Sequence, residues 1–170
     1  MIRSPSRRGF LALPLAFAAL ASRGRPLQTA TAGVDWADVL LIDGSVLRAE
    51  SLRAQAVVVE FWASWCPFCA RQNPHLQALW DAQRDKGLRV LTFSIDREAA
   101  IARSYVTEHR YTFPVAMASG QSTRWFGVRR GLPMLYVVGA DGHIVFEEAG
   151  EMFPEDVAAL ARFAMPGRGT

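Results

Sequence analysis

The sequence predicts a single α/β domain in which helices flank a mixed β-sheet. Short, β-branched apolar segments alternate with helical patterns through the middle of the chain, as in strand–helix–strand units. Two Asp-Gly pairs, Asp43-Gly44 and Asp141-Gly142, indicate antiparallel hairpins near the two ends of that region. With 170 residues, 51% of them apolar, the chain is long enough to bury one core and too short for two domains.

The expected elements begin with a hairpin that joins residues 36–42 to 46–48. A buried strand over 57–61 follows, because this run is apolar and β-branched. Residues 67–84 show helical spacing, and Pro74 inside them predicts a kink, since proline lacks the N–H that a helix interior needs. The later elements are a strand over 88–94, a helix over 97–109, a strand over 115–117, a helix over 122–126, strands over 135–138 and 144–148, and a closing helix over 154–164.

Residues 1–32 have the pattern of an export signal. Arg7-Arg8 precedes an apolar stretch over 10–21, which is a twin-arginine pattern, and this stretch is shorter than the ~20 residues that cross a bilayer. Small residues predict cleavage after Ala32, or alternatively after Ala21, which leaves 33–170 as the folded domain. An ordinary secretory signal and a retained anchor are the other interpretations. In each case we expect a location outside the cytoplasm, in the periplasm.

The positive charge of the chain resides in this leader. The formal net charge is +3, but residues 33–170 contain 14 of the 19 basic residues and all 16 acidic ones. The domain is therefore slightly acidic, and its charge predicts no nucleic-acid partner.

Cys66 and Cys69 are the only cysteines, and they lie in the segment Trp-Cys-Pro-Phe-Cys. A structural disulfide across so small a loop would constrain the unfolded chain little, and the three histidines are too scattered to complete a zinc site. Redox exchange is the remaining interpretation. Cys66 would stand at a helix N-terminus, where the helix dipole favours the thiolate that attacks a disulfide. Cys69, one turn further on, would resolve the mixed disulfide.

Glu60 is a single carboxyl group in an apolar strand. Burial without a partner would raise its pKa and make it a candidate proton acceptor for Cys69. The alternative is that Glu60 reaches solvent or pairs with an arginine.

Residues 60–69, Glu-Phe-Trp-Ala-Ser-Trp-Cys-Pro-Phe-Cys, resemble the active-site segment of thioredoxin-like proteins, with Glu60 at the position of the buried acid. The patterns at 94–96, 111–115 and 127–133 extend the resemblance to the TlpA/ResA-like (redoxin) branch of exported thiol-disulfide oxidoreductases. The resemblance covers about residues 34–165. It implies a thioredoxin-like fold with an N-terminal β-hairpin and an extra helical insertion.

The same resemblance implies roles for further residues. Pro133 matches the cis-proline that lies beside the cysteines, although from the sequence alone it could be a plain proline at the start of a strand. Trp62 would pack beneath the disulfide. The substrate-binding residues that the resemblance implies are Trp65, Pro67, Phe68 and Leu132. Phe68 stands where a second proline is common in the branch, and this departure leaves the direction of electron flow open.

Two other features have local interpretations. His75 lies two turns beyond Cys69 and is interpreted as a partly exposed helical histidine, not a catalytic partner. Arg129-Arg130 could make a substrate rim positive or form a solvated turn, and we prefer the turn.

The function that we expect is thiol-disulfide exchange with exported proteins, in the direction of a reductase that receives electrons from a membrane thiol carrier. Cytochrome c maturation is a candidate pathway by resemblance. We expect a monomer with no metal and no cofactor beyond the redox-active disulfide Cys66–Cys69. The alternatives are a dithiol oxidase and a copper-handling chaperone, which would favour a Cys-x-x-x-Cys spacing that is missing here. A peroxidase would need a Thr-x-x-Cys segment, also missing.

Overall fold

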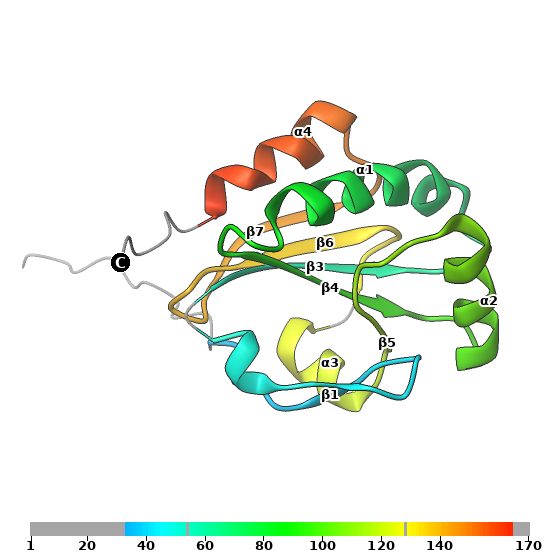
Figure 1. Cartoon of the computed structure of the whole chain (residues 1–170), viewed down its shortest axis with the longest axis horizontal. Coiled ribbons are helices and arrows are strands. Elements are labelled where there is room, and N and C mark those ends of the chain that lie inside the picture. The colour runs from blue at the N-terminus through cyan, green and yellow to red at the C-terminus, as the bar shows by residue number, and fades with distance from the viewer. Residues whose placement is uncertain (1–32, 54, 128, 165–170) are drawn as a thin grey trace, which may run out of the picture.

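The computed structural model of the chain describes residues 33–53, 55–127 and 129–164. A five-stranded sheet with the order β5-β4-β3-β6-β7 forms its centre (Figure 1). Strand β3 runs parallel to β4 and antiparallel to β6, so the sheet is mixed as predicted. The strands are β3 (Ala56–Trp62), β4 (Leu88–Ser94), β5 (Val115–Met117), β6 (Met134–Val138) and β7 (Ile144–Ala149).

Helices and a hairpin cover the two faces of this sheet. Helices α1 and α4 lie on one face, and α3 and the hairpin lie on the other (Figure 1). The helices are α1 (Pro67–Gln83), α2 (Ala99–His109), α3 (Gly120–Phe126) and α4 (Pro154–Ala159); the hairpin strands are β1 (Val39–Leu40) and β2 (Val46–Leu47); and 3₁₀ turns cover η1 (Ala49–Ser51) and η2 (Leu160–Phe163).

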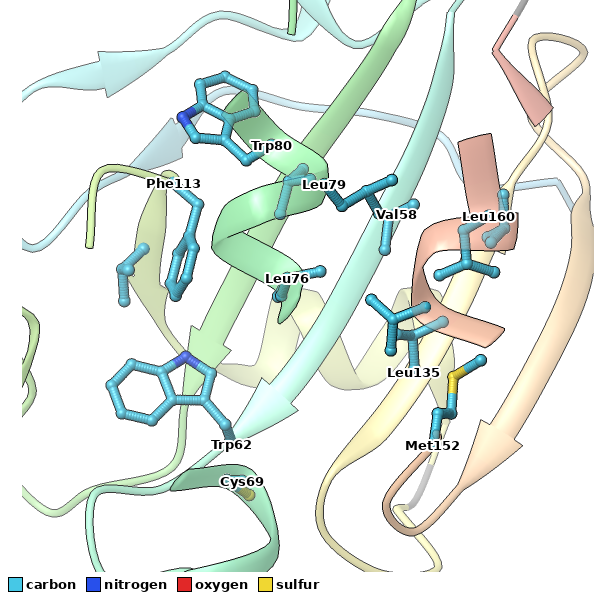
Figure 2. Packing of buried hydrophobic residues seen from close by; sticks show 14 of the residues in the cluster. Val58, Trp62, Cys69, Leu76, Leu79, Trp80, Phe113, Leu135, Met152 and Leu160 are labelled. Carbon is cyan, nitrogen blue, oxygen red and sulfur yellow. The ribbon is translucent and has the colours of Figure 1, made fainter. Parts of the chain in front are cut away.

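Strand β3 is the central element of the core, and all seven of its residues are buried. Side chains alternate along a strand, so Val58 and Trp62 pack under α1 while Val57 and Phe61 pack on the other face. Figure 2 shows the first of these clusters, in which Trp62 and Cys69 share a core with side chains of α1, β6 and α4. Glu60 points to the same face of β3 as Val58 and Trp62, and its carboxyl group therefore lies under α1.

The predicted order of strands and helices is confirmed, with differences at the element ends. Helix α3 begins earlier than predicted, because Ser119 and Ser122 form a reciprocal capping box that starts it at Gly120. The closing helix ends at Ala159 and tightens into a 3₁₀ turn, which is common at helix C-termini. Helix α1 continues through Pro74 from Pro67 to Gln83.

The predicted export signal over 1–32 lies outside the described residues. Within 33–53, 55–127 and 129–164, no helix combines the length and the hydropathy that crossing a bilayer requires.

Candidate active site

A short loop connects the end of β3 to Cys66 at the start of α1, and Asp96 holds this loop in place. The buried carboxylate of Asp96 accepts hydrogen bonds from the Ser64 N–H at 3.2 Å and from the Ser64 hydroxyl at 2.8 Å. It also accepts one from the hydroxyl of Ser94, at the end of β4, at 2.8 Å. The loop that leads to Cys66 is thus tied to the neighbouring parallel strand β4.

The two cysteines adopt the geometry that thiol exchange requires. Cys66 is the N-cap of α1, and its Sγ accepts a hydrogen bond from the Cys69 N–H at 3.3 Å. Pro67 occupies the first turn, where its missing N–H costs nothing. Both thiols are free, with Cys66 4% and Cys69 0% exposed. The Sγ atom of Cys66 thus lies at the N-terminal end of α1 with a backbone N–H directed at it.

The Cys69 thiol lies deeper in the protein. Burial raises its pKa, and the adjacent Cys66 and Glu60 act in the same direction because each disfavours a second negative charge. Cys69 can therefore act as a nucleophile only if a neighbouring group removes its proton.

Glu60 is suited to that task by its environment. Its side chain is 0% exposed, and burial raises its pKa to about 8, a rise that the nearby amide of Gln72 moderates. No ion pair with Glu60 occurs among the described residues, so the alternatives of a solvent-facing or arginine-paired carboxyl are wrong.

Two amides of α1 surround Glu60. With its amide nitrogen toward them, Asn73 donates to Oε1 of Glu60 at 3.3 Å and to the carbonyl oxygen of Cys69 at 3.2 Å. Gln72 accepts the Met152 N–H through Oε1 at 2.7 Å, while its Nε2 and the second oxygen of Glu60 have no hydrogen-bond partner among the described residues. Both side chains are fully buried. Glu60 and Cys69 thus share one polar site inside an apolar cluster.

An open cavity of about 580 Å³ lies beside Cys66. Its lining includes all four predicted substrate-binding residues, Trp65, Pro67, Phe68 and Leu132. The Trp65 and Phe68 side chains are 66% and 50% exposed, so both present apolar surface at this cavity. The Leu132–Pro133 peptide bond is cis. Trp62 is fully buried, and its indole N–H donates to the Thr92 hydroxyl at 3.1 Å.

The remaining sequence features have different outcomes. His75 is a partly exposed residue of α1, as predicted. Arg129 and Arg130 line the cavity beside Cys66, as the rim interpretation expects, and the Arg130 side chain is also exposed to solvent, as the turn interpretation expects. No cluster of three or more potential metal ligands is found among the described residues.

Sequence reasoning missed Gln72, Asn73 and the role of Asp96. Polar residues three and four positions after Cys69 could have signalled the first two, since residues of a helix that are one turn apart share a face. Asp96 gave no comparable signal, because its partner Ser64 is distant in sequence and meets it only through the pairing of β3 with β4.

The protein has a dithiol at the start of the helix that follows a buried central strand, and it has a cis-proline among the described residues. This is the arrangement of thioredoxin-like thiol-disulfide oxidoreductases, and the protein is an enzyme of that class. The chain belongs to the AhpC/TSA family, which it matches over residues 36–147.

Known proteins of this class are similar to the chain over most of its length. It is 25% identical to the thiol-disulfide oxidoreductase ResA of Bacillus anthracis over 126 residues, which cover 74% of this chain and 72% of ResA. A thiol:disulfide interchange protein of Chlorobium tepidum superposes with a TM-score of 0.69 at 23% identity, over 75% of this chain and 91% of that one. StoA from Bacillus subtilis superposes with a TM-score of 0.63 at 20% identity, over 75% and 95% of the two chains. These structures establish the thioredoxin-like fold.

Proposed function

We propose that this protein is an exported reductase that transfers two electrons to disulfides of extracytoplasmic proteins. The main support is the position of Cys66: its Sγ accepts the Cys69 N–H, and the residue lines an open cavity that a segment of another protein can enter. The exchange uses the Cys66–Cys69 pair and needs no other cofactor and no metal.

In the proposed reaction the Cys66 thiolate attacks one sulfur of a client disulfide. The client S–S bond breaks, a Cys66–client disulfide forms, and the other client sulfur leaves as a thiolate that takes up a proton. Cys69 then transfers its proton to Glu60 and attacks Sγ of Cys66. The second client thiolate leaves, and the enzyme retains a Cys66–Cys69 disulfide. The client gains the two electrons that the two enzyme thiols lose.

Glu60 and the cis-proline loop have separate roles in this proposal. Glu60 accepts the Cys69 proton, for which its raised pKa of about 8 is well matched near neutral pH. Pro133 faces the client. Leu132 forms no backbone hydrogen bond to a described residue, so its N–H and C=O can pair with an extended client segment.

Export and electron supply complete the proposal. The twin-arginine pattern in 1–32 supports export to the periplasm with removal of the leader, and the resemblance of residues 34–165 to exported thiol-disulfide oxidoreductases supports work outside the cytoplasm. A membrane thiol carrier would reduce the Cys66–Cys69 disulfide after each cycle. Cytochrome c maturation is one pathway that could use such a reductase, and we propose a monomer as the working form.

The reduction potential of the Cys66–Cys69 couple tests the direction of transfer. Equilibration of the protein with dithiothreitol mixtures, followed through the fluorescence of the adjacent Trp65, would give this value. A reductase should lie near thioredoxin at about −270 mV, and an oxidase near about −120 mV. A potential at the oxidising end would overturn the proposed direction in favour of the dithiol oxidase. The Cys66→Ser variant, which cannot form the disulfide, supplies the baseline fluorescence.

A further inference from the structure

The cavity beside Cys66 carries a distinctive combination of exposed apolar and cationic side chains. We propose that this docking surface, formed by Trp65, Phe68, Ile95, Arg129, Arg130 and Leu132, selects client segments that carry acidic residues next to their reactive cysteine. This inference rests on the proposed function, because it names the class of segment that the exchange site accepts.

The apolar part of the surface explains why a protein segment would bind there. Trp65 and Phe68 are among the most exposed large apolar side chains of the described residues, at 66% and 50%. They flank Cys66 in the sequence and line the same cavity. Exposed aromatic side chains that surround a reactive group are typical of contact surfaces, since covering them removes apolar area from water.

The charged part of the docking surface is positive. Arg129 and Arg130 line the cavity, and no acidic residue does. The guanidinium of Arg130 pairs with Glu147, which offsets its charge. The guanidinium of Arg129 lies over the Phe61 ring, 5.1 Å from its centroid, and has no carboxylate partner among the described residues. Arg129 therefore supplies the uncompensated positive charge.

The positive charge is local, not a property of the whole domain. Residues 33–170 contain 14 basic and 16 acidic residues, so the domain as a whole is slightly acidic. A third arginine near the site, Arg71, stacks on the Phe68 ring at 4.8 Å but pairs with Glu151. A cationic rim beside Cys66 on a slightly acidic protein would attract a negatively charged segment and disfavour a positively charged one.

The test compares three synthetic peptide disulfides that differ only in the residues flanking the cysteine, which are glutamate, glutamine or lysine. The measured quantity is the second-order rate constant for reduction by the reduced protein, divided by that of the same peptide with dithiothreitol. This division removes the effect of the flanking charge on the intrinsic reactivity of the disulfide. We expect the glutamate peptide to exceed the lysine peptide by about fivefold at low ionic strength, and the ratio to fall toward one at high salt.

Two variants test whether Arg129 causes the preference for the glutamate peptide. Arg129→Gln should reduce the ratio between the glutamate and lysine peptides. Arg84→Gln removes an exposed arginine at the opposite end of α1 and should leave the ratio at its parental value. Equal rate constants for the two charged peptides, or faster reduction of the lysine peptide, would overturn the inference while leaving the exchange function intact. If none of the three peptides is reduced, including the neutral glutamine peptide, the proposed function itself fails.

Discussion

The side-chain amide of Asn73 donates to Oε1 of Glu60 at 3.3 Å, and through its other hydrogen to the Cys69 carbonyl oxygen at 3.2 Å. One residue of α1 therefore holds a buried acid of β3 beside the turn that carries Cys69. An amide can donate to the carboxylate and so favours the charged form, whereas burial alone favours the neutral form. The balance between burial on one side and the amides of Asn73 and Gln72 on the other sets the pH range in which Glu60 can accept a proton.

Replacing Asn73 with leucine should shift the balance toward the neutral form of Glu60. Without the amide donor, the pKa of Glu60 should rise above about 8, and the resolving step should need a higher pH to reach half its maximal rate. Stopped-flow measurement of Cys66–Cys69 disulfide formation against pH would show the shift. Gln77→Leu removes an amide from a partly exposed position of the same helix, where Gln77 contacts Thr112, and should leave the midpoint in place. Coincident pH profiles for the parent and Asn73→Leu would assign Asn73 a structural role only.

Glu60→Gln should slow the resolving step and leave the first attack at Cys66 intact. The amide cannot accept the Cys69 proton, so the mixed disulfide should accumulate, and loss of a general base lowers a rate by about 100-fold or more. Single-turnover reactions followed by mass spectrometry would separate the two steps. The defect should narrow as pH rises, because hydroxide can then remove the proton. A resolving rate equal to that of the parent would leave Glu60 without a catalytic role.

The same carboxyl should make stability depend on pH. The pKa of Glu60 is about 8 in the folded protein, against 4.5 for the free group, so between these values the folded state holds a proton that the unfolded state has released. The free energy of unfolding should therefore fall as pH rises from about 4.5 to about 8, by at most about 1.4 kcal/mol per unit. It should level off above pH 8, where Glu60 is ionised in both states.

Urea unfolding of the reduced protein at about pH 5 and about pH 8 measures this effect. The Glu60→Gln variant lacks the titrating group, so its stability relative to the parent should improve as pH rises across that window. Histidines and surface acids titrate equally in both proteins and cancel in the comparison. Parallel stability curves for the two proteins would show that the carboxyl is not held neutral in the folded state.

The sequence predicted the elements of this fold better than the polar contacts of the site. The strand over 56–62 and the helix after Cys66 are coded locally, by apolar runs and helical spacing, and so could be predicted. The surroundings of Glu60 depend on which face of β3 meets which face of α1, and the helical spacing of Gln72 and Asn73 after Cys69 does not by itself place them beside Glu60. Arg129 illustrates the same limit, because its position in the cavity beside Cys66 depends on the packing of distant loops.

The two cysteines should differ in their substitution phenotypes. Cys66→Ser should abolish exchange, because the attacking sulfur is lost. Cys69→Ser should retain the first attack but fail to release the client, and so trap a mixed disulfide at Cys66. Non-reducing electrophoresis after incubation with a disulfide-containing protein would show the trapped adduct, and its absence from the double variant would be the control. Normal turnover by Cys69→Ser would show that the assigned roles are wrong.

Asp96 should stabilise the active-site loop without touching the substrate. Its carboxylate accepts three hydrogen bonds, from the N–H and hydroxyl of Ser64 and from the hydroxyl of Ser94. In Asp96→Ala the Ser64 N–H loses its acceptor near the protein interior, and this should cost about 1–3 kcal/mol of unfolding free energy. The loop before Cys66 would also lose its tie to β4, so the first attack on a disulfide should slow more than the loss of folded protein explains.

Asp85→Ala, at an exposed position after α1, is the matched control and should change neither the stability nor the rate of the first attack appreciably. Denaturant unfolding measures the change in stability, and the single-turnover rate in the absence of denaturant measures the change in the first attack. If the Asp96→Ala protein is destabilised but its first attack on a disulfide is as fast as that of the parent, Asp96 has a role in stability only.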